Sequence, residues 1–318
     1  MTRDTPTLSV VIPTHNTRDL TLAAVAAVQG AEPEAEIIVV DDASSDGTVE
    51  VLASRMPDAA CVRSATRQGF SVTANSGLTR ARGEVVVLLN SDTQVRPGAL
   101  AAMTRAFSQK PRLGVAGARL IYPDGQPQWS GGRFPTQLWL AVLVSGVAAR
   151  RSRPRRAVST GAAAVDWVTG AAMAVRREVL ETIGPLDEGY AFYAQDLDYC
   201  RRAREAGWAV DLVADAEVVH HHGATIGADR GAAGGVRLDL LWSDLLRYVT
   251  IHDGPGAGRR ARFLMRSVLA ARRATRTLLA PWVPSCRRAD HRALGEALAR
   301  AAQALGSAEI ENQSKEAW

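Results

Sequence analysis

The stretch LSVVIPTHN, residues 8–16, begins with an apolar, β-branched run that stops at Pro13. Such a run is typical of a buried strand, and the composition of residues 17–29 predicts a helix directly after it. Two further strand-like runs, EIIVV at 36–40 and EVVVLL at 84–89, are separated from it by helical sequence. Strands that alternate with helices predict an α/β fold with right-handed crossovers and a mostly parallel sheet covered on both faces.

Polar residues follow each of these three strands at its carboxyl end. Open α/β sheets bind their ligands outside the carboxyl ends of the strands, so we expect one crevice there. Its residues are Pro13, Thr14, His15 and Asn16 after the first strand, Asp41 and Asp42 after the second, and Asn90, Ser91 and Asp92 after the third.

The middle of the chain is less regular. Residues 111–165 are rich in Gly, Pro and Arg, which predicts loops with one short apolar segment. Strand-like sequence returns at 165–177, and a helix is predicted over 196–206. Two more strands, at 208–213 and 217–220, complete the expected domain.

Positive charge is concentrated near the C-terminus. The whole chain carries +5, but residues 229–292 contain 13 arginines against 5 aspartates, so the remainder is acidic. Helices are predicted at 237–251 and 259–279, and the second has seven arginines and no acidic residue. Arginines mixed with apolar side chains suit a helix on anionic lipid headgroups, although a packed helix with a solvated basic face would look the same. The acidic remainder argues against a nucleic-acid partner.

The composition, 47% hydrophobic and 22% charged, is that of a globular protein. Cys61, Cys200 and Cys286 lie too far apart to indicate a disulfide framework or a zinc site. The longest apolar stretch, 138–149, is too short to span a bilayer, and residues 1–6 are polar, unlike a signal peptide. We therefore expect a cytoplasmic location, with peripheral attachment to the inner face of the plasma membrane as the alternative.

Five segments together resemble a known family. They are VVIPTHN (10–16), DDASSDGT (41–48), RQGFSVTANSG (67–77), LLNSDT (88–93) and GAAMAVRREVLETIGPLDEGYAFYAQDLDYCRRAREAGW (170–208). In this order they are similar to the signatures of inverting family 2 glycosyltransferases, particularly the bacterial rhamnosyltransferase-like branch. The resemblance implies a Rossmann-like GT-A nucleotide-diphospho-sugar transferase domain at 6–226. A basic helical region at 227–285 and a helical or partly disordered tail at 286–318 would follow it.

The resemblance implies a donor site that binds a nucleotide-diphosphate sugar. Asp92 would hold a divalent metal, Mg²⁺ or Mn²⁺, that bridges the diphosphate, and His220 is the best match to a second ligand within His220–His222. Asn90 stands where the stricter pattern has an aspartate, and Arg67 stands where the family usually has asparagine. The residues expected around the nucleotide sugar are Pro13, Thr14, Asn16, Asp41, Asp42, Arg67, Gly69, Asn75, Asn90 and Ser91.

Transfer also needs a base within hydrogen-bond reach of the acceptor hydroxyl. The resemblance assigns this role to Asp196, while Gln195 replaces a common glutamate and cannot ionise. Asp198 is expected to face elsewhere, as a charge favoured near a helix N-terminus. Trp167 and Gly170 are the expected acceptor contacts, although Trp167 is equally compatible with a core position. The implied acceptor is a glycan or lipid-linked glycan of cell-envelope polysaccharide synthesis, and rhamnose is the leading donor sugar.

Two other classes of protein stay open at this point. A nucleotidyltransferase shares the nucleotide-binding half and the metal carboxylates, but it would carry a basic glycine-rich loop where this chain has PTHN. A non-catalytic nucleotide-sugar or nucleic-acid binding protein is disfavoured by the presence of Asp92, Asp196 and His220. Salt-dependent DNA binding without donor hydrolysis would favour that last class.

Overall fold

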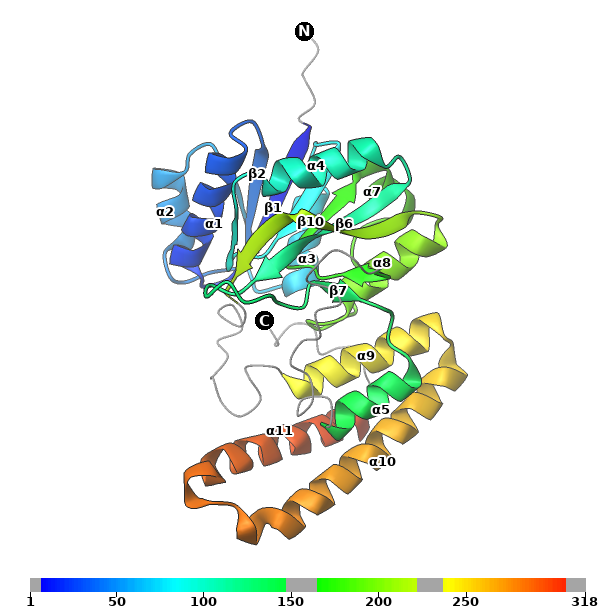
Figure 1. Ribbon diagram of the computed structural model, residues 1–318. Coiled ribbons are helices and arrows are strands. Elements are labelled where there is room, and N and C mark those ends of the chain that lie inside the picture. Colours follow the sequence, from blue (N-terminus) through cyan, green and yellow to red (C-terminus); the bar gives the residue numbers. More distant parts are fainter. Residues whose placement is uncertain (1–6, 147–164, 222–236, 307–318) are drawn as a thin grey trace.

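A mixed eight-stranded sheet forms one half of the protein, and helices from the C-terminal part lie beneath it in the computed structural model (Figure 1). The structure describes residues 7–146, 165–221 and 237–306. The sheet has the order β3-β2-β1-β4-β9-β6-β10-β5, and β7 pairs with β8 apart from it.

The strands are β1 (Leu8–Thr14), β2 (Glu36–Asp41), β3 (Ala60–Arg63), β4 (Val85–Leu89), β5 (Thr93–Val95), β6 (Leu113–Ile121), β7 (Gly131–Gly132), β8 (Trp167–Val168), β9 (Ala172–Arg176) and β10 (Ala209–His220). The α-helices are α1 (Arg18–Ala31), α2 (Thr48–Arg55), α3 (Phe70–Leu78), α4 (Ala99–Gln109), α5 (Gln137–Ser145), α7 (Arg177–Ile183), α8 (Gln195–Glu205), α9 (Leu238–His252), α10 (Pro255–Leu279) and α11 (Arg288–Gly306).

The sheet is less parallel than the sequence predicted. Strands β3, β2, β1 and β4 run parallel, as do β6 and β10, but β9 lies antiparallel between β4 and β6, and β5 is antiparallel to β10. The alternation of strands and helices, on which the prediction depended, covers only the first half of the chain. No βα crossover of the kind found in the first half connects β9 to the strands beside it. The alternation of strands and helices therefore could not predict the direction of β9.

The prediction of loops over residues 111–165 is wrong for three segments. They are β6, a buried strand in the sheet, the short strand β7, and the helix α5. The glycines of β6 misled the prediction, because they serve close packing here. A Cβ at Gly114 would lie 2.6 Å from Cβ of Trp208, and one at Gly117 would lie 2.5 Å from Cβ of Val168. The two strands predicted at 208–213 and 217–220 are one strand, β10, with a register irregularity against β6 between Val213 and Glu217.

Both faces of the sheet are buried, as predicted. Alternate residues of a strand point to opposite faces, and Val10 and Ile12 of β1 pack in a core with α1 and α4. Val11, on the other face, belongs to a second core that includes α3, α8, α9, α10 and α11. The C-terminal helices therefore share a hydrophobic core with the sheet. Within the described ranges, none of the helices combines the length and apolar character that a membrane span requires.

Candidate active site

One cavity at the carboxyl edge of the sheet brings together the three residues predicted to carry the chemistry. It has a volume of about 440 Å³, and Asp92, Asp196 and His220 all line it. Asn90, Trp167 and Gly170 also line it. Residues that are more than a hundred positions apart in the sequence therefore share one site.

Asp92 and His220 meet where β4 turns into β5. Thr93 of β5 pairs with His220 of β10, and the His221 backbone N–H donates a 2.9 Å hydrogen bond to the Asp92 carbonyl oxygen. This pairing sets the Asp92 Oδ1 atom 3.3 Å from His220 Nε2, and both residues are buried.

Gln128 fixes the orientation of the His220 ring. Its Nε2 donates to the His220 carbonyl oxygen at 2.5 Å, so its Oε1 faces His220 Nδ1 at 2.9 Å. Because an amide oxygen only accepts, this network assigns the proton to Nδ1. The lone pair of Nε2 is then directed toward Asp92. A histidine held in this way is the usual arrangement of a metal ligand, and Gln128 was not among the predicted site residues.

The donor atoms of this pair fit a small divalent cation. Magnesium binds oxygen ligands at about 2.1 Å in octahedral geometry, which places adjacent ligand atoms about 3.0 Å apart. The 3.3 Å between Asp92 Oδ1 and His220 Nε2 is close to that spacing. Across residues 7–146, 165–221 and 237–306, no group of three or more His, Cys, Asp or Glu side chains is arranged to hold a metal ion. Substrate phosphates and water would therefore have to supply the other ligands, as they commonly do for Mg²⁺.

Apart from Asn90, the predicted nucleotide-binding residues do not line this cavity. Asp42 accepts hydrogen bonds from the backbone N–H groups of Gln68 and Gly69, at 2.7 and 3.0 Å, and thereby fixes the turn before α3. Asp41 is buried, and its Oδ1 atom has no hydrogen-bond partner among the described residues. Arg67 lies next to this turn and is exposed. A direct nucleotide contact by any of these side chains stays a prediction.

Several other predicted nucleotide contacts are engaged inside the protein. Asn75 is hydrogen-bonded to both backbone groups of Leu186, each at 2.9 Å. The Thr14 hydroxyl contacts that of Thr21 at 2.6 Å, and the Ser91 hydroxyl is 2.9 Å from another buried threonine hydroxyl. Pro13 belongs to β1 and is also buried. These contacts give the four residues a structural role, and a role in binding stays a prediction.

Three turns with positive φ follow strands at this edge of the sheet or border the cavity. Among the described residues, Asn16, Ala43 and Ala194 are the non-glycine residues with positive φ, at 51°, 56° and 64°. Asn16 follows β1, Ala43 follows β2, and Ala194 directly precedes α8. Such conformations cost about 1–3 kcal/mol and gather where a binding site imposes them. Their positions support a functional site at this edge.

Asp196 is held at the start of α8 by backbone N–H groups. Its Oδ2 accepts a 2.9 Å hydrogen bond from Gly170, and its Oδ1 accepts one of the same length from Leu197. Burial raises the pKa of Asp196 above its usual value, and these hydrogen bonds offset the rise only in part. A raised pKa makes the ionised carboxylate a better proton acceptor. Gly170 therefore contacts the proposed base directly. Its predicted contact with the acceptor stays a prediction.

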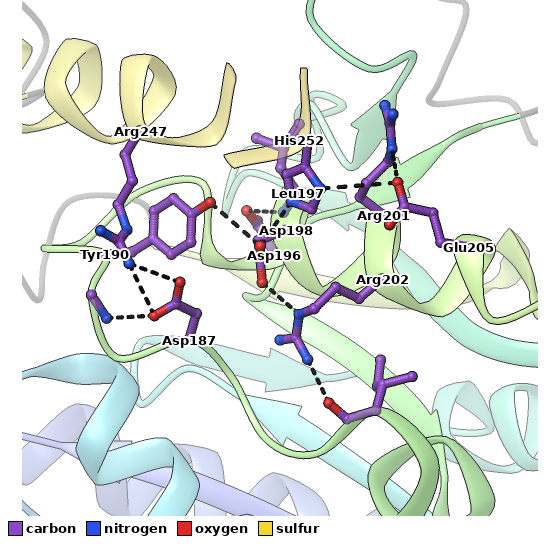
Figure 2. Close-up of polar contacts among 12 residues, drawn as sticks. Asp187, Tyr190, Asp196, Leu197, Asp198, Arg201, Arg202, Glu205, Arg247 and His252 are labelled. Atoms are coloured by element: carbon purple, nitrogen blue, oxygen red, sulfur yellow. Dashed lines mark hydrogen bonds and ion pairs between the residues drawn. The ribbon is translucent and has the colours of Figure 1, made fainter. Parts of the chain in front are cut away.

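Asp198 does not line the cavity and pairs with other side chains. It contacts His252 Nε2 and Arg202 Nε at 2.9 and 2.8 Å, as Figure 2 shows. Burial raises the pKa of Asp198, but these two partners outweigh that effect and lower it overall. Asp198 therefore connects α8 to α9.

Aromatic side chains form another part of the cavity wall, and only Trp167 among them was identified from the sequence. Trp167 is buried, and its Nε1 donates to the Arg133 carbonyl oxygen at 3.2 Å. Its ring meets that of Trp129 edge-on at 5.2 Å. Trp129 lines the cavity but is 54% exposed, and the ring of Trp139 lies 6.4 Å from its ring. No periodic pattern marks Trp129 in the sequence, and its exposure beside the cavity is what identifies it.

The strand-edge cavity, with its buried carboxylate and histidine pair and a second carboxylate at a helix start, is the arrangement expected of a GT-A type glycosyltransferase. The model of the glycosyl transferase family 2 matches residues 9–184, and the chain belongs to this family. The family and the GT-A fold predicted from the sequence are thus confirmed.

Comparison with individual proteins agrees with this assignment. The chain is 28% identical over 220 residues to the N-acetylglucosaminyl-diphospho-decaprenol L-rhamnosyltransferase of Mycobacterium tuberculosis, covering 62% of this chain and 70% of that protein. It is 29% identical over 248 residues to an uncharacterized protein of Sinorhizobium fredii, where it covers 70% of this chain but spans only 25% of the relative. The structure is similar to mannosyltransferase PcManGT of Pyrobaculum calidifontis, solved with GDP-Man and Mn²⁺. The TM-score is 0.56 at 20% identity, over 96% of this chain and 87% of that one.

Proposed function

We propose that this protein transfers a sugar, with inversion, from a nucleoside diphosphate donor to a hydroxyl of a lipid-linked glycan. The single observation that carries the proposal is the shared cavity of Asp92, His220 and Asp196. Asp92 and His220 would hold a divalent cation, Mg²⁺ or Mn²⁺, which stabilises the charge that develops on the leaving diphosphate. Asp196 takes the proton from the acceptor hydroxyl as the oxygen attacks the anomeric carbon.

The number of carboxylates in the cavity supports inversion. Among the described residues that line it, Asp92 and Asp196 are the two carboxylates. If Asp92 holds the cation beside the diphosphate and Asp196 acts as the base, neither carboxylate is available to form a covalent sugar intermediate. A retaining double displacement needs such a nucleophile, whereas a single displacement does not.

The relatives support the substrate class. The name of the Mycobacterium tuberculosis relative gives rhamnose as the transferred sugar and a decaprenol-linked acceptor for that protein. A glucosyltransferase of Campylobacter jejuni, 35% identical over 109 residues that cover 33% of this chain and 35% of that protein, is named for an undecaprenol-linked acceptor. We therefore propose a polyprenyl-linked acceptor of cell-envelope polysaccharide synthesis for this chain, and rhamnose as the first donor sugar to test.

The test is a screen of nucleotide sugars, including dTDP-rhamnose, for release of nucleoside diphosphate in the presence of Mn²⁺ or Mg²⁺ and of polyprenyl diphosphate-linked sugars. We expect metal-dependent release with one donor and a product of inverted anomeric configuration. Absence of release with every donor, or incorporation of a nucleotide instead of a sugar, would contradict the proposal.

The basic helix α10 could bring the enzyme to such an acceptor. Its exposed arginines include Arg259, Arg260, Arg266 and Arg273, and Phe263 between them is 75% exposed. Exposed Trp282 follows the helix. Arginines beside exposed apolar side chains are the combination that binds anionic lipid surfaces. Contact of residues 259–279 with an anionic membrane at the inner face of the plasma membrane therefore remains our proposal, and we propose no nucleic-acid partner.

Replacing Gln128 with leucine is expected to weaken metal binding about 10- to 100-fold, because the His220 ring loses the acceptor that fixes its tautomer. The measurement is Mn²⁺ affinity by electron paramagnetic resonance or calorimetry, without a donor sugar. Gln126→Leu, at an exposed position two residues away, is the matched control and should bind Mn²⁺ as the parent does. Equal affinities of the Gln128 variant and the parent would show that Gln128 does not support a metal ligand.

Replacing Trp129 with alanine is expected to raise KM for the acceptor about 3- to 10-fold, since an exposed indole beside the cavity offers a stacking face for a sugar ring. KM for the donor should stay unchanged, and Trp129→Phe should retain most of the acceptor affinity. Ile251→Ala removes an apolar side chain of similar exposure, 47%, outside the cavity and serves as the control. An unchanged acceptor KM in Trp129→Ala would remove this residue from the acceptor site.

A further inference from the structure

The segment that leads into α8 is fastened to α9 by a buried carboxylate. Three consecutive backbone N–H groups, from Ala191, Phe192 and Tyr193, donate hydrogen bonds of 3.0, 3.0 and 2.8 Å to Asp244. Asp244 lies on α9 and is only 2% exposed. Successive N–H groups can form an anion-binding concavity. Here the bound anion is a side chain of the protein itself.

Two further side chains of α9 hold the same region (Figure 2). Arg247 lies 3.0 Å from Asp187, and His252 lies 2.9 Å from Asp198. These contacts are on either side of Asp196 in the sequence. Helix α9 therefore contacts the chain before and after the proposed base.

The segment that Asp244 holds is the one that sets Asp196 in the cavity. Ala194 follows directly after Tyr193, has a φ of 64°, and is the last residue before α8. Every residue from Phe192 to Asp196 lines the cavity. A non-glycine residue keeps such a backbone conformation only when its surroundings impose it. The hydrogen bonds to Asp244 fix the three residues immediately before that turn.

Asp244 holds this position at the expense of stability. Burial raises the pKa of Asp244 to about 6, although the three N–H groups and the charge of Arg247 lower it. Its usual pKa is about 3.9, so the folded state favours the protonated form. The preference of the folded state for protonated Asp244 stabilises the fold. This contribution is complete below the usual pKa and is lost as the pH rises through 6, so ionised Asp244 opposes folding at neutral pH.

We propose that Asp244 is a positioning residue of the transfer reaction, which holds the backbone of residues 191–193 so that the Asp196 carboxylate faces the acceptor hydroxyl. This inference rests on the proposed function. It places a residue that positions the base on α9, outside residues 9–184 that the family model matches. Leu241 and Leu245 of the same helix also line the cavity, so α9 supplies both a wall and a support of the site.

The test is Asp244→Asn in the full chain. Asparagine keeps the size of the side chain but turns an amide N–H toward backbone N–H donors, so at least one of the three hydrogen bonds is lost. We expect kcat to fall about 100-fold, the effect of a displacement of about 1 Å at a reacting group. KM for the donor should change less than about threefold, because the donor site is not altered. Hydrogen exchange at the amides of 191–193 should become faster.

Two variants distinguish positioning from general stability. Asp253→Asn alters a partly exposed carboxylate just after the C-terminal end of α9 and should leave kcat unchanged. Asp244→Glu restores the carboxylate and should recover most of the lost kcat. A lowered melting temperature with an unchanged kcat for the folded Asp244→Asn enzyme would overturn the proposal, and so would unchanged exchange at 191–193.

The parent protein provides the same test if Asp244→Asn does not fold. The charged or titratable side chains that interact with Asp244 are Arg247, Tyr190 and Tyr193, and burial raises the pKa of Tyr193 to about 12, so the carboxylate alone titrates near pH 6. The N–H groups of 191–193 lower the pKa of Asp244, so they bind the ionised carboxylate more strongly than the protonated one. Protection of the 191–193 amides, relative to that of other core amides, should therefore fall as the pH drops through 6, and a constant ratio would overturn the proposal. Exchange needs no substrate, so it remains decisive even if the parent transfers no sugar, which would refute the proposed function instead.

Discussion

Asp196→Asn is expected to lower kcat for sugar transfer by about 10²- to 10⁴-fold, the contribution of a general base to a transfer of this kind. The amide has the size of the carboxylate and keeps an oxygen for the Gly170 N–H, so the cavity should retain its shape. What it loses is the ability to take a proton. Donor binding, measured by calorimetry with a nucleotide sugar and metal, should therefore be unchanged. Steady-state transfer rates give the loss directly.

Glu205→Gln, at the exposed end of the same helix, is the matched control and should transfer sugar at the parental rate. The pH profile provides a second measurement. Because burial raises the pKa of Asp196, kcat/KM at saturating metal should fall on the acid side at a pH above the usual carboxyl value of about 3.9. In the parent, kcat/KM rises with pH as the Asp196 carboxylate ionises. This rise on the acid side of the profile should be absent from the residual activity of Asp196→Asn. Turnover of Asp196→Asn at the parental rate would show that another group is the base.

Asp92→Asn is expected to reduce kcat/KM by about 10³-fold, because metal stabilisation of the leaving diphosphate is worth several kcal/mol and each 1.36 kcal/mol is a factor of ten. The charge of Asp92 is the only anionic ligand that this pair of side chains offers to a cation. Mn²⁺ affinity should therefore fall together with the rate. Calorimetric titration with Mn²⁺, in the presence and absence of nucleoside diphosphate, measures the first effect.

Asp124→Asn, in the exposed turn after β6, removes the same charge outside the site and should leave both quantities unchanged. High Mn²⁺ concentration should restore part of the activity of Asp92→Asn if the defect is weak metal binding. Parental activity of Asp92→Asn in the presence of a chelator would mean that the diphosphate leaves without metal assistance, and the role of Asp92 would have to be abandoned.

Local sequence predicted the parts of the fold that have a local cause. The runs at 8–12, 36–40 and 84–89 are buried strands because continuous apolar, β-branched sequence suits a strand covered on both faces. The polar residues that follow them lie at the carboxyl edge of the sheet, as the βα alternation implied. The helices of 237–251 and 259–279 also follow from local composition. The division of the chain at 226, which followed from the resemblance and from the change in composition, stays a prediction, and α9 beyond it contacts the cavity.

Other features depend on contacts between distant residues. Strand β6 looks like a loop in the sequence because Gly114 and Gly117 lack side chains, and only the packing of Trp208 and Val168 explains those glycines. In the sequence, nothing distinguishes Gln128 from other polar residues of an irregular stretch. Only the folded structure brings it into contact with His220 of β10.

The sequence by itself determined the family, the α/β class and the identity of the chemical groups, since these depend on residue types and their order along the chain. Tertiary structure decided which groups share a cavity, which are engaged inside the protein, and which helix supports Asp196. The physical reason is that a strand run or a helix start depends on neighbours within a few residues. The 3.3 Å approach of Asp92 to His220, and the contacts of Asp244 with the backbone before α8, depend on how the whole chain packs.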